Sequence, residues 1–236
     1  MKDTFDEETG TYYTDGLPDI DECLKSKIRR MRLSDDTVLI GICAFDGCVA
    51  LESIRIPETV TTLEDYAFHN CSALRTLTLP EGLEFIGNGA FDGCSGLEVL
   101  YIPSSVDHIG HGVFKNCSGL KKVSISSKNP YFRIDVRGMI YSTDGTKMIG
   151  CTIPICGTYI IPETVRIIDG FAFHGCTELT EVKLPSELEV IGMNAFEGCE
   201  NLRSVHIPSN VKYIGGGLFT GCRNQECVNL PMRFQE

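Results

Sequence analysis

The feature that most constrains this chain is a short string, Ala-Phe-Asp-Gly-Cys, which stands at 44–48 and again at 90–94. Close variants bring the copies to seven, with phenylalanines at Phe45, Phe68, Phe91, Phe114, Phe173, Phe196 and Phe219. Successive phenylalanines are 23 residues apart, except for one interval of 59. A fixed period of roughly 20–29 residues is typical of a solenoid, in which each coil of chain stacks on the one before. The repetition therefore indicates a repeat array and not a single catalytic motif.

Each coil begins with an apolar string that predicts a short β-strand. In Leu97-x-x-Leu100-x-Ile102 the last residues alternate between apolar and polar, as they do along a half-buried strand. Equivalent strings end at Leu33, Ile56, Leu79, Ile102, Ile125, Ile161, Leu184, Ile207 and Leu230, which gives nine strands. Since a whole coil separates each strand from the next, we expect parallel strands that form one sheet along one side.

The rest of each coil predicts the opposite side of the solenoid. An extended segment such as Leu83-x-x-Ile86 comes first, and the Ala-Phe-x-Gly-Cys unit follows. We expect this unit to form one short helical turn with its alanine, phenylalanine and cysteine facing inward. The residue before each cysteine is always Gly or Asn, which tolerate the left-handed backbone that ends a helical turn. The predicted fold is a right-handed α/β solenoid with a parallel sheet on one face.

One coil and the two ends depart from the pattern. The strand ends Ile125 and Ile161 are 36 residues apart, and Asp144-Gly145 separates two apolar segments between them, as in a β-hairpin. We expect a variant hairpin unit at 126–155 within an array that covers 28–231. Residues 1–27 then form an N-terminal segment, loose over 1–16 and helical over 17–27 where it caps the first strand, and 232–236 form a tail.

The repeating pattern Ile-Pro-x-x-Val-x-x-Ile-Gly-x-x-Ala-Phe-x-x-Cys-x-x-Leu-x-x-Val-x-Ile resembles the BspA-like (Treponema pallidum-type) leucine-rich repeats. The segment Asn129–Phe132, which leads into Tyr141–Lys147, resembles a variant unit of that family. The resemblance implies a leucine-rich-repeat solenoid that binds proteins, typically a bacterial or protist surface protein in adhesion to host proteins or other cells. It thus implies a secreted or cell-surface location. Residues 1–20 contain no apolar signal peptide, so an intracellular scaffold in the cytoplasm is the alternative.

Charge and hydropathy exclude several classes of partner. The net charge of −11 argues against nucleic acids and anionic membranes, which bind basic surfaces. No stretch approaches the ~18 consecutive apolar residues of a transmembrane helix, so we expect no membrane insertion. We also expect a monomer.

The twelve cysteines do not predict a metal site. Seven follow the 23-residue period, and stacked side chains ~4.8 Å apart are too distant for disulfides, whose Cβ atoms lie ~3.8 Å apart. We expect these seven to be buried free thiols, Cys156 to be a strand core residue and Cys227 to point outward. Cys23, Cys151 and Cys227 remain candidates for an exposed disulfide. There is no Cys-x-x-Cys pair, His-Glu-x-x-His, Gly-x-Ser-x-Gly or phosphate loop, so we expect no metal, no cofactor and no enzyme activity.

The strongest functional signal lies on the outward side of the nine strands. Of 27 outward positions, nine are basic and four acidic, so this strip carries +5 and the remainder of the −11 chain carries −16. The sequence predicts a partner-binding face with candidates Arg30, Arg32, Arg55, Arg75, Tyr101, Lys121, Lys122, Lys183, Arg203 and His206. The partner would be an acidic host or cell-surface protein, or a glycan. Charges on strand faces also serve solubility alone, and that interpretation stays open.

Overall fold

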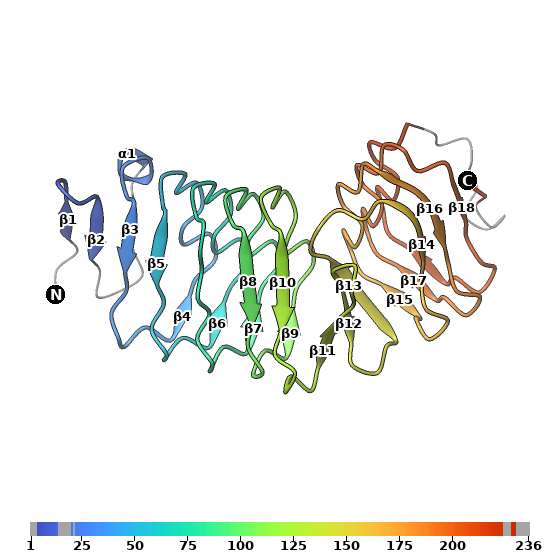
Figure 1. The fold of residues 1–236 in the computed structure, drawn as a ribbon, viewed down its shortest axis with the longest axis horizontal. Helices are drawn as coiled ribbons and strands as arrows, with labels where there is room; N and C mark the ends of the chain where they lie inside the picture. The colour runs from blue at the N-terminus through green and yellow to red at the C-terminus, as the bar shows by residue number, and fades with distance from the viewer. Residues whose placement is uncertain (1–3, 14–19, 21, 224–227, 230–236) are drawn as a thin grey trace. The chain divides into compact units, whose positions relative to one another are not determined.

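The computed structural model describes residues 4–13, 20, 22–223 and 228–229 (Figure 1). The chain forms two compact units, Met1–Tyr131 and Phe132–Glu236. We call them the N-terminal unit and the C-terminal unit and describe each by itself. The boundary between them falls inside the predicted variant segment 126–155.

The N-terminal unit has a four-stranded back sheet and, on its other side, a four-stranded and a two-stranded sheet, which we together call its front sheet (Figure 1). The front sheet comprises β1 (Thr4–Asp6), β2 (Thr11–Tyr13), β3 (Arg30–Arg32) and β5 (Ser53–Arg55), and further along β8 (Val99–Ile102) and β10 (Lys122–Ile125). The back sheet comprises β4 (Leu39–Ile40), β6 (Thr62–Leu63), β7 (Phe85–Ile86) and β9 (His108–Ile109), all parallel. The strand expected to end at Leu79 appears only as a bridge between Thr76 and Val99, although Leu79 is buried.

The 23-residue period sets the register of the front sheet. Arg30, Met31 and Arg32 pair with Ser53, Ile54 and Arg55, each 23 residues later. The same offset pairs Val99–Ile102 with Lys122–Ile125. Because side chains alternate between the two faces of a strand, every coil buries the same positions and exposes the same positions. Equivalent residues therefore stand in continuous rows.

The core of each unit is a column of stacked phenylalanines. In the N-terminal unit the ring centroids of Phe45 and Phe68 are 5.1 Å apart, and those of Phe68 and Phe91 are 6.0 Å apart. In the C-terminal unit, the rings of Phe173 and Phe196 are 5.2 Å apart. All five rings are completely buried. The columns confirm the stacking that the sequence period predicts.

The expected helical turns are wrong, and the Ala-Phe-x-Gly-Cys units form consecutive tight turns. Hydrogen bonds within a unit join residues three apart, as from the Cys48 N–H to the Phe45 carbonyl at 3.1 Å. The Phe45 N–H instead donates to Ala67 of the next coil at 2.9 Å. Positive φ angles at Cys43 (55°) and Gly47 (73°) interrupt any helical run. Both effects remove the residue i to i−4 bonds that an α-helix requires, and α1 (Glu22–Lys25) is the one helix among the described residues.

The C-terminal unit also has a front and a back sheet. Its front sheet contains β14 (Gly157–Ile160), β16 (Leu179–Lys183), β18 (Ser204–His206) and β20 (Val228–Asn229). Its back sheet contains β11 (Phe132–Ile134), β12 (Met139–Ser142), β13 (Lys147–Cys151), β15 (Ile167–Ile168), β17 (Val190–Ile191) and β19 (Tyr213–Ile214). The antiparallel β12 and β13 confirm the predicted hairpin around Asp144-Gly145. The hairpin joins the back sheet because β13 pairs with β15 in parallel.

The N-terminal segment is more ordered than the sequence predicts. Instead of being loose, Thr4–Asp6 and Thr11–Tyr13 form an antiparallel hairpin, and β2 continues the front sheet by pairing in parallel with β3. Tyr12 is buried opposite Met31, which ties the hairpin to the apolar core. The helix expected within 17–27 is present as α1.

The seven periodic cysteines are buried free thiols, as predicted: Cys48, Cys71, Cys94, Cys117, Cys176, Cys199 and Cys222. The prediction for Cys156 is wrong, because this residue is exposed. A register shift between Gly157 and Thr158 places Gly157 opposite Leu179, so Cys156 loses the inward position that the period assigns to it. Ile155 is buried in its place. The side chain of Cys23 and all of Cys227 lie outside the described part of the structure.

Candidate partner-binding face

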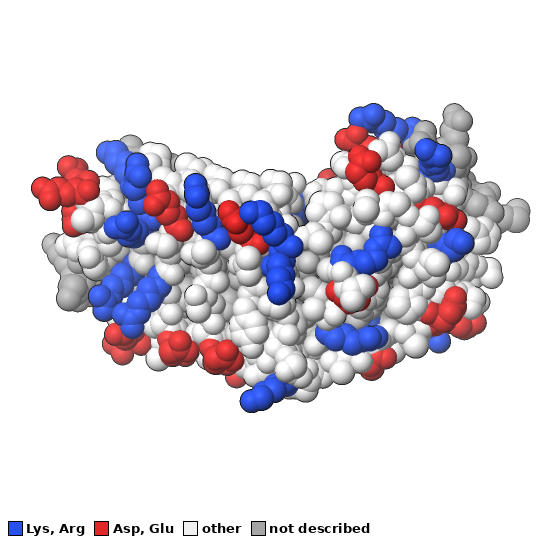
Figure 2. All heavy atoms as spheres, viewed as in Figure 1, with Lys and Arg blue, Asp and Glu red and all other residues white. Residues whose placement is uncertain are grey.

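Two exposed rows cross the front sheet of the N-terminal unit. The first, which we call the Tyr13 row, runs through Tyr13, Arg32 and Arg55, and two periods after Arg55 it includes Tyr101 beside Ser124. Its two tyrosines are 37% and 44% exposed, and both arginines are exposed. The second, the Arg30 row, runs through Thr11, Arg30 and Ser53 and continues to Thr76, Val99 and Lys122. Figure 2 shows Lys and Arg side chains recurring from strand to strand across this face.

A third column of equivalent positions, just before the strands, alternates basic and acidic residues. Residues 29, 52, 75, 98 and 121 are Arg, Glu, Arg, Glu and Lys, each one period from the next. Arg29 lies 3.3 Å from Glu52, and Lys121 lies 2.7 Å from Glu98. The hydrogen bond from Lys121 lowers the pKa of Glu98, and the charges of Lys121 and Arg75 lower it further. Arg75 and Lys121, both predicted candidates, thus belong to a column of opposite charges within the protein.

The remaining cations of this face are less compensated by nearby carboxylates. Within the described residues, no carboxylate lies in ion-pair distance of Arg30, Arg32 or Lys122. Arg55 has one partner, Asp35, at 3.5 Å, and both of these side chains are largely exposed. An exposed ion pair of this kind contributes little and can be exchanged for another partner. The structure therefore brings Arg30, Arg32 and Arg55 together as available guanidinium groups.

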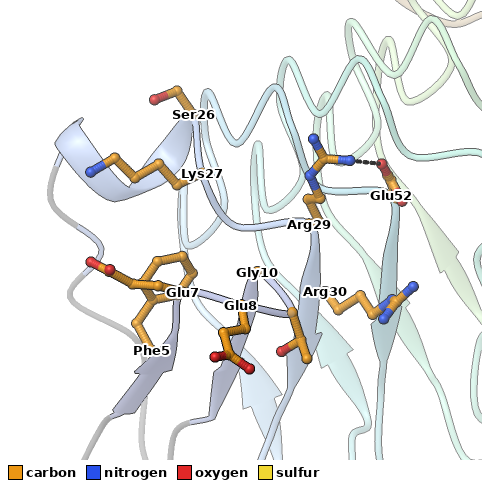
Figure 3. A pocket seen from close by; sticks show the side chains of 10 residues that line it. Phe5, Glu7, Glu8, Gly10, Ser26, Lys27, Arg29, Arg30 and Glu52 are labelled. Carbon is orange, nitrogen blue, oxygen red and sulfur yellow. Dashed lines mark hydrogen bonds and ion pairs between the residues drawn. The ribbon is translucent and has the colours of Figure 1, made fainter.

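An open pocket of about 830 Å³ lies beside Arg30, between the β1–β2 hairpin and the start of β3 (Figure 3). Its charged lining consists of Lys27, Arg29 and Arg30 together with Glu7, Glu8 and Glu52. The two signs balance, so the pocket has no net preference for anions. The repeat pattern does not predict this pocket, because the pocket depends on the β1–β2 hairpin. The sequence does contain a signal for the hairpin, since the strand-like segments Thr-Phe-Asp and Thr-Tyr-Tyr flank the turn Glu-Glu-Thr-Gly.

The front sheet of the C-terminal unit carries the other predicted candidates. Lys183 is exposed in β16, His206 is exposed in β18, and Arg203 is exposed just before β18. Lys183 pairs in register with Ile160, whose side chain is 65% exposed. Glu181 lies two residues before Lys183 on the same face and accepts a hydrogen bond from Thr158. This face therefore mixes apolar, basic and acidic groups and has no cluster like that of Arg30, Arg32 and Arg55.

The described residues offer no constellation for metal chemistry. No three side chains among their His, Cys, Asp and Glu residues are grouped to hold an ion. No helix in the same part of the chain is long and apolar enough to cross a membrane. The exposed strand rows remain the principal candidate for function.

Parallel ladders repeating every 23 residues define the leucine-rich-repeat class of solenoid proteins. The model for the BspA type leucine rich repeat region matches residues 22–136 and 156–236 in six copies. The chain therefore belongs to the BspA-type leucine-rich-repeat family, as the resemblance implied. A search of curated proteins found no match.

Solved structures with the same fold come from several bacteria. A leucine-rich repeat protein from Eubacterium ventriosum is 22% identical with a TM-score of 0.78, covering 93% of this chain and 67% of that one. The pneumococcal vaccine antigen PcpA is 22% identical with a TM-score of 0.62, covering 86% of this chain and 62% of PcpA. A leucine rich cell surface protein from Faecalibacterium prausnitzii is 24% identical with a TM-score of 0.59, and the match covers 84% of this chain and 65% of that one. The chain thus spans about two thirds of the length of these proteins.

Proposed function

We propose that the chain is a non-catalytic protein-binding module and that the front sheet of its N-terminal unit docks an acidic partner protein. The observation that carries this proposal is the side-by-side placement of Arg32 and Arg55, with Arg30 on the same strand as Arg32. Leucine-rich-repeat proteins are generally interaction scaffolds, and their repeats present extended binding surfaces.

The chemistry of the rows favours carboxylate groups on an extended protein surface. Guanidinium groups bind carboxylates through two parallel hydrogen bonds, and Arg and Tyr are enriched where proteins bind one another. Tyr13 and Tyr101, at the two ends of the Tyr13 row, supply aromatic contact area. The strongly acidic remainder of the chain repels an acidic partner, so the basic rows also orient its approach.

We propose adhesion or host interaction at a bacterial or protist surface as the setting. A protein of similar fold from Faecalibacterium prausnitzii is described as a cell surface protein, which supports this choice. An intracellular scaffold is the second candidate. It is favoured by buried thiols that donate hydrogen bonds, such as Cys71 to the Phe45 carbonyl at 3.1 Å, because cytosolic proteins keep their thiols reduced. Protease treatment of intact cells separates the two, since only a surface protein is degraded.

The binding proposal is tested with two probes, poly-L-glutamate as an acidic polypeptide and heparin as a sulfated glycan. We expect the wild-type protein to bind poly-L-glutamate with an affinity that falls as salt is added. Arg32→Glu is expected to weaken binding about tenfold or more, because it removes one guanidinium and repels the probe. Lys128→Glu is the matched control, since Lys128 is exposed, follows β10 and undergoes the same change of charge.

Equal loss of binding in Arg32→Glu and Lys128→Glu would show that net charge alone matters and would reject the sheet-face site. Retained binding in both variants would reject it as well. Binding of heparin but not of poly-L-glutamate, lost in Arg32→Glu, would keep the site and replace the protein partner by a glycan.

A further inference from the structure

Among the buried cysteines whose thiol hydrogen bonds the structure describes, five follow one rule and Cys176 does not. In the N-terminal unit, the thiols of Cys71, Cys94 and Cys117 each donate to the carbonyl of the phenylalanine 26 residues earlier, at 3.1 Å. Cys199 and Cys222 do the same in the C-terminal unit, at 3.1 and 3.2 Å. Each of these five thiols is thereby occupied by a backbone carbonyl of the preceding coil.

Cys176 is the exception, because the coil before it carries the hairpin in place of the Ala-Phe-x-Gly-Cys unit. Its Sγ lies 3.5 Å from the Sγ of Cys151, the last residue of β13. The backbone N–H of Ile155 also points at the Cys176 sulfur, at 3.2 Å. The Cys151 N–H donates to the Ala172 carbonyl at 2.8 Å, which holds the two coils at this spacing. The variant coil therefore places a second sulfur where the other coils place a carbonyl oxygen.

We propose that Cys151 and Cys176 form a redox-active pair, at which a peroxide converts two thiols into one disulfide. Cys151 is only partly buried as a residue, so the pair lies close to the surface on the Cys151 side, whereas Cys176 is completely buried. A disulfide has an S–S length of about 2.05 Å, so the sulfurs must approach by roughly 1.5 Å. Rotation about the Cα–Cβ bonds can supply a movement of this size without separating the paired strands.

The hydrogen bonds around the pair favour a thiolate at Cys176. The pKa of Cys176 is lowered chiefly by the hydrogen bond that the Cys151 thiol donates to it. The Ile155 N–H and the positive charge of Arg137 lower it further, and together they outweigh the effect of burial. The same hydrogen bond, together with burial, raises the pKa of Cys151. By contrast, burial raises the pKa of Cys117, another of the seven periodic cysteines, to about 12. Since thiolates and not thiols attack peroxides, Cys176 is the periodic cysteine that these hydrogen bonds favour for oxidation, with peroxide entering past the partly exposed Cys151.

The reaction balances without any further reactant. The Cys176 thiolate attacks one peroxide oxygen, so that an S–O bond forms, the O–O bond breaks, and the leaving hydroxide takes the Cys151 thiol proton to become water. The Cys151 thiolate then attacks the sulfur of the Cys176 sulfenic acid, forming the S–S bond and breaking the S–O bond. The second hydroxide takes up the proton that Cys176 released earlier. Two thiols and one hydrogen peroxide thus give one disulfide and two waters.

The test treats the full chain with hydrogen peroxide, blocks remaining thiols under denaturing conditions and measures intact mass and tryptic peptides. We expect a loss of two hydrogen atoms and a cross-link between the tryptic peptides 148–166 and 167–183. Because the first of these peptides also contains Cys156, two variants assign the bond. Cys151→Ser should abolish the cross-link, and Cys156→Ser, which changes an exposed side chain, should retain it.

The proposal is overturned if the wild-type protein gains no cross-link, if the cross-link persists in Cys151→Ser, or if it disappears in Cys156→Ser. The wild-type protein and Cys156→Ser decide the question even if Cys151→Ser does not fold.

Discussion

Arg32 lies directly opposite Arg55 in the parallel pairing of β3 with β5. Like charges in adjacent positions of neighbouring strands are unfavourable. The column of residues 29, 52, 75, 98 and 121 shows that the same sheet can alternate its charges. A need for solubility alone would be met equally well by alternation, so the adjacent arginines, of which only Arg55 has a carboxylate partner among the described residues, favour a role in binding.

This relationship predicts opposite effects of charge reversal in adjacent columns. Arg32→Glu places a carboxylate opposite Arg55 and should raise the free energy of unfolding by about 0.2–1 kcal/mol. Glu52→Arg places like charges together next to Arg29 and should lower it by a similar amount. Urea unfolding at low and high salt measures both, and salt should reduce both effects. A loss of stability in Arg32→Glu would contradict the unfavourable pairing.

The ion pair between Glu98 and Lys121 predicts a specific pH dependence. The folded-state pKa of Glu98 is lowered, chiefly by the hydrogen bond from Lys121. The stabilisation from this pair is therefore present above the unfolded pKa of a glutamate and is lost as pH falls through the folded pKa. NMR titration should give Glu98 a midpoint below that of an ordinary glutamate. Lys121→Met should raise this midpoint, and an unchanged midpoint would exclude Lys121 as the cause.

Close packing between coils predicts that two equivalent glycines differ in tolerance. A Cβ atom at Gly93 would lie 2.4 Å from the Asn70 Oδ1 and 3.1 Å from its Cα, whereas at Gly47 the nearest atom, Lys25 Cδ, is 3.7 Å away. Both residues have positive φ, so alanine costs about 1–2 kcal/mol of strain at either site. Gly93→Ala should cost at least about 1 kcal/mol more, because overpacking adds to the strain. Equal losses in the two variants by chemical denaturation would argue against tight stacking at this turn.

Burial of the seven periodic cysteines predicts which thiols react in the folded protein. Cys43 and Cys156 are exposed and should be alkylated rapidly by iodoacetamide at pH 8. Cys117 should stay unmodified, because burial raises its pKa to about 12 and leaves almost no thiolate. Peptide mass spectrometry after a short reaction reads the pattern. Rapid alkylation of Cys117 without unfolding would contradict the burial of the periodic cysteines.

The sequence predicts the repeating frame well because the frame depends on period alone. Positions 23 residues apart share an environment, so the core phenylalanines and the exposed Arg32 and Arg55 could be placed from their spacing. The alternating column at Arg29 and Glu52 was equally visible in that spacing. The hydrophobic pattern could not reveal the back sheet, whose N-terminal strands, such as β6, contain two residues each and show no alternation.

The remaining errors arise from local backbone geometry. Tight turns and a single helical turn bury the same residues, and they differ in backbone features such as the positive φ of Cys43, Tyr66 and Phe171, residues that rarely adopt it. Cys156 is misplaced because a register shift at Gly157 displaces the coil after the hairpin. The same hairpin brings Cys151 beside Cys176, although 25 residues separate them instead of the usual 23.

Deletion of whole and partial coils tests the stacking in register most directly. Removal of residues 74–96 takes out one complete 23-residue coil and joins Ala73 to Leu97, so that Arg55 moves next to Tyr101 in the Tyr13 row. Removal of residues 74–94 takes out 21 residues, so every later position is displaced by two residues relative to its equivalent in the preceding coil. We expect the first protein to keep a cooperative unfolding transition by circular dichroism in urea and the second to lose it in the N-terminal unit. If the two deletions gave the same transition, the chain would not be built from stacked 23-residue coils.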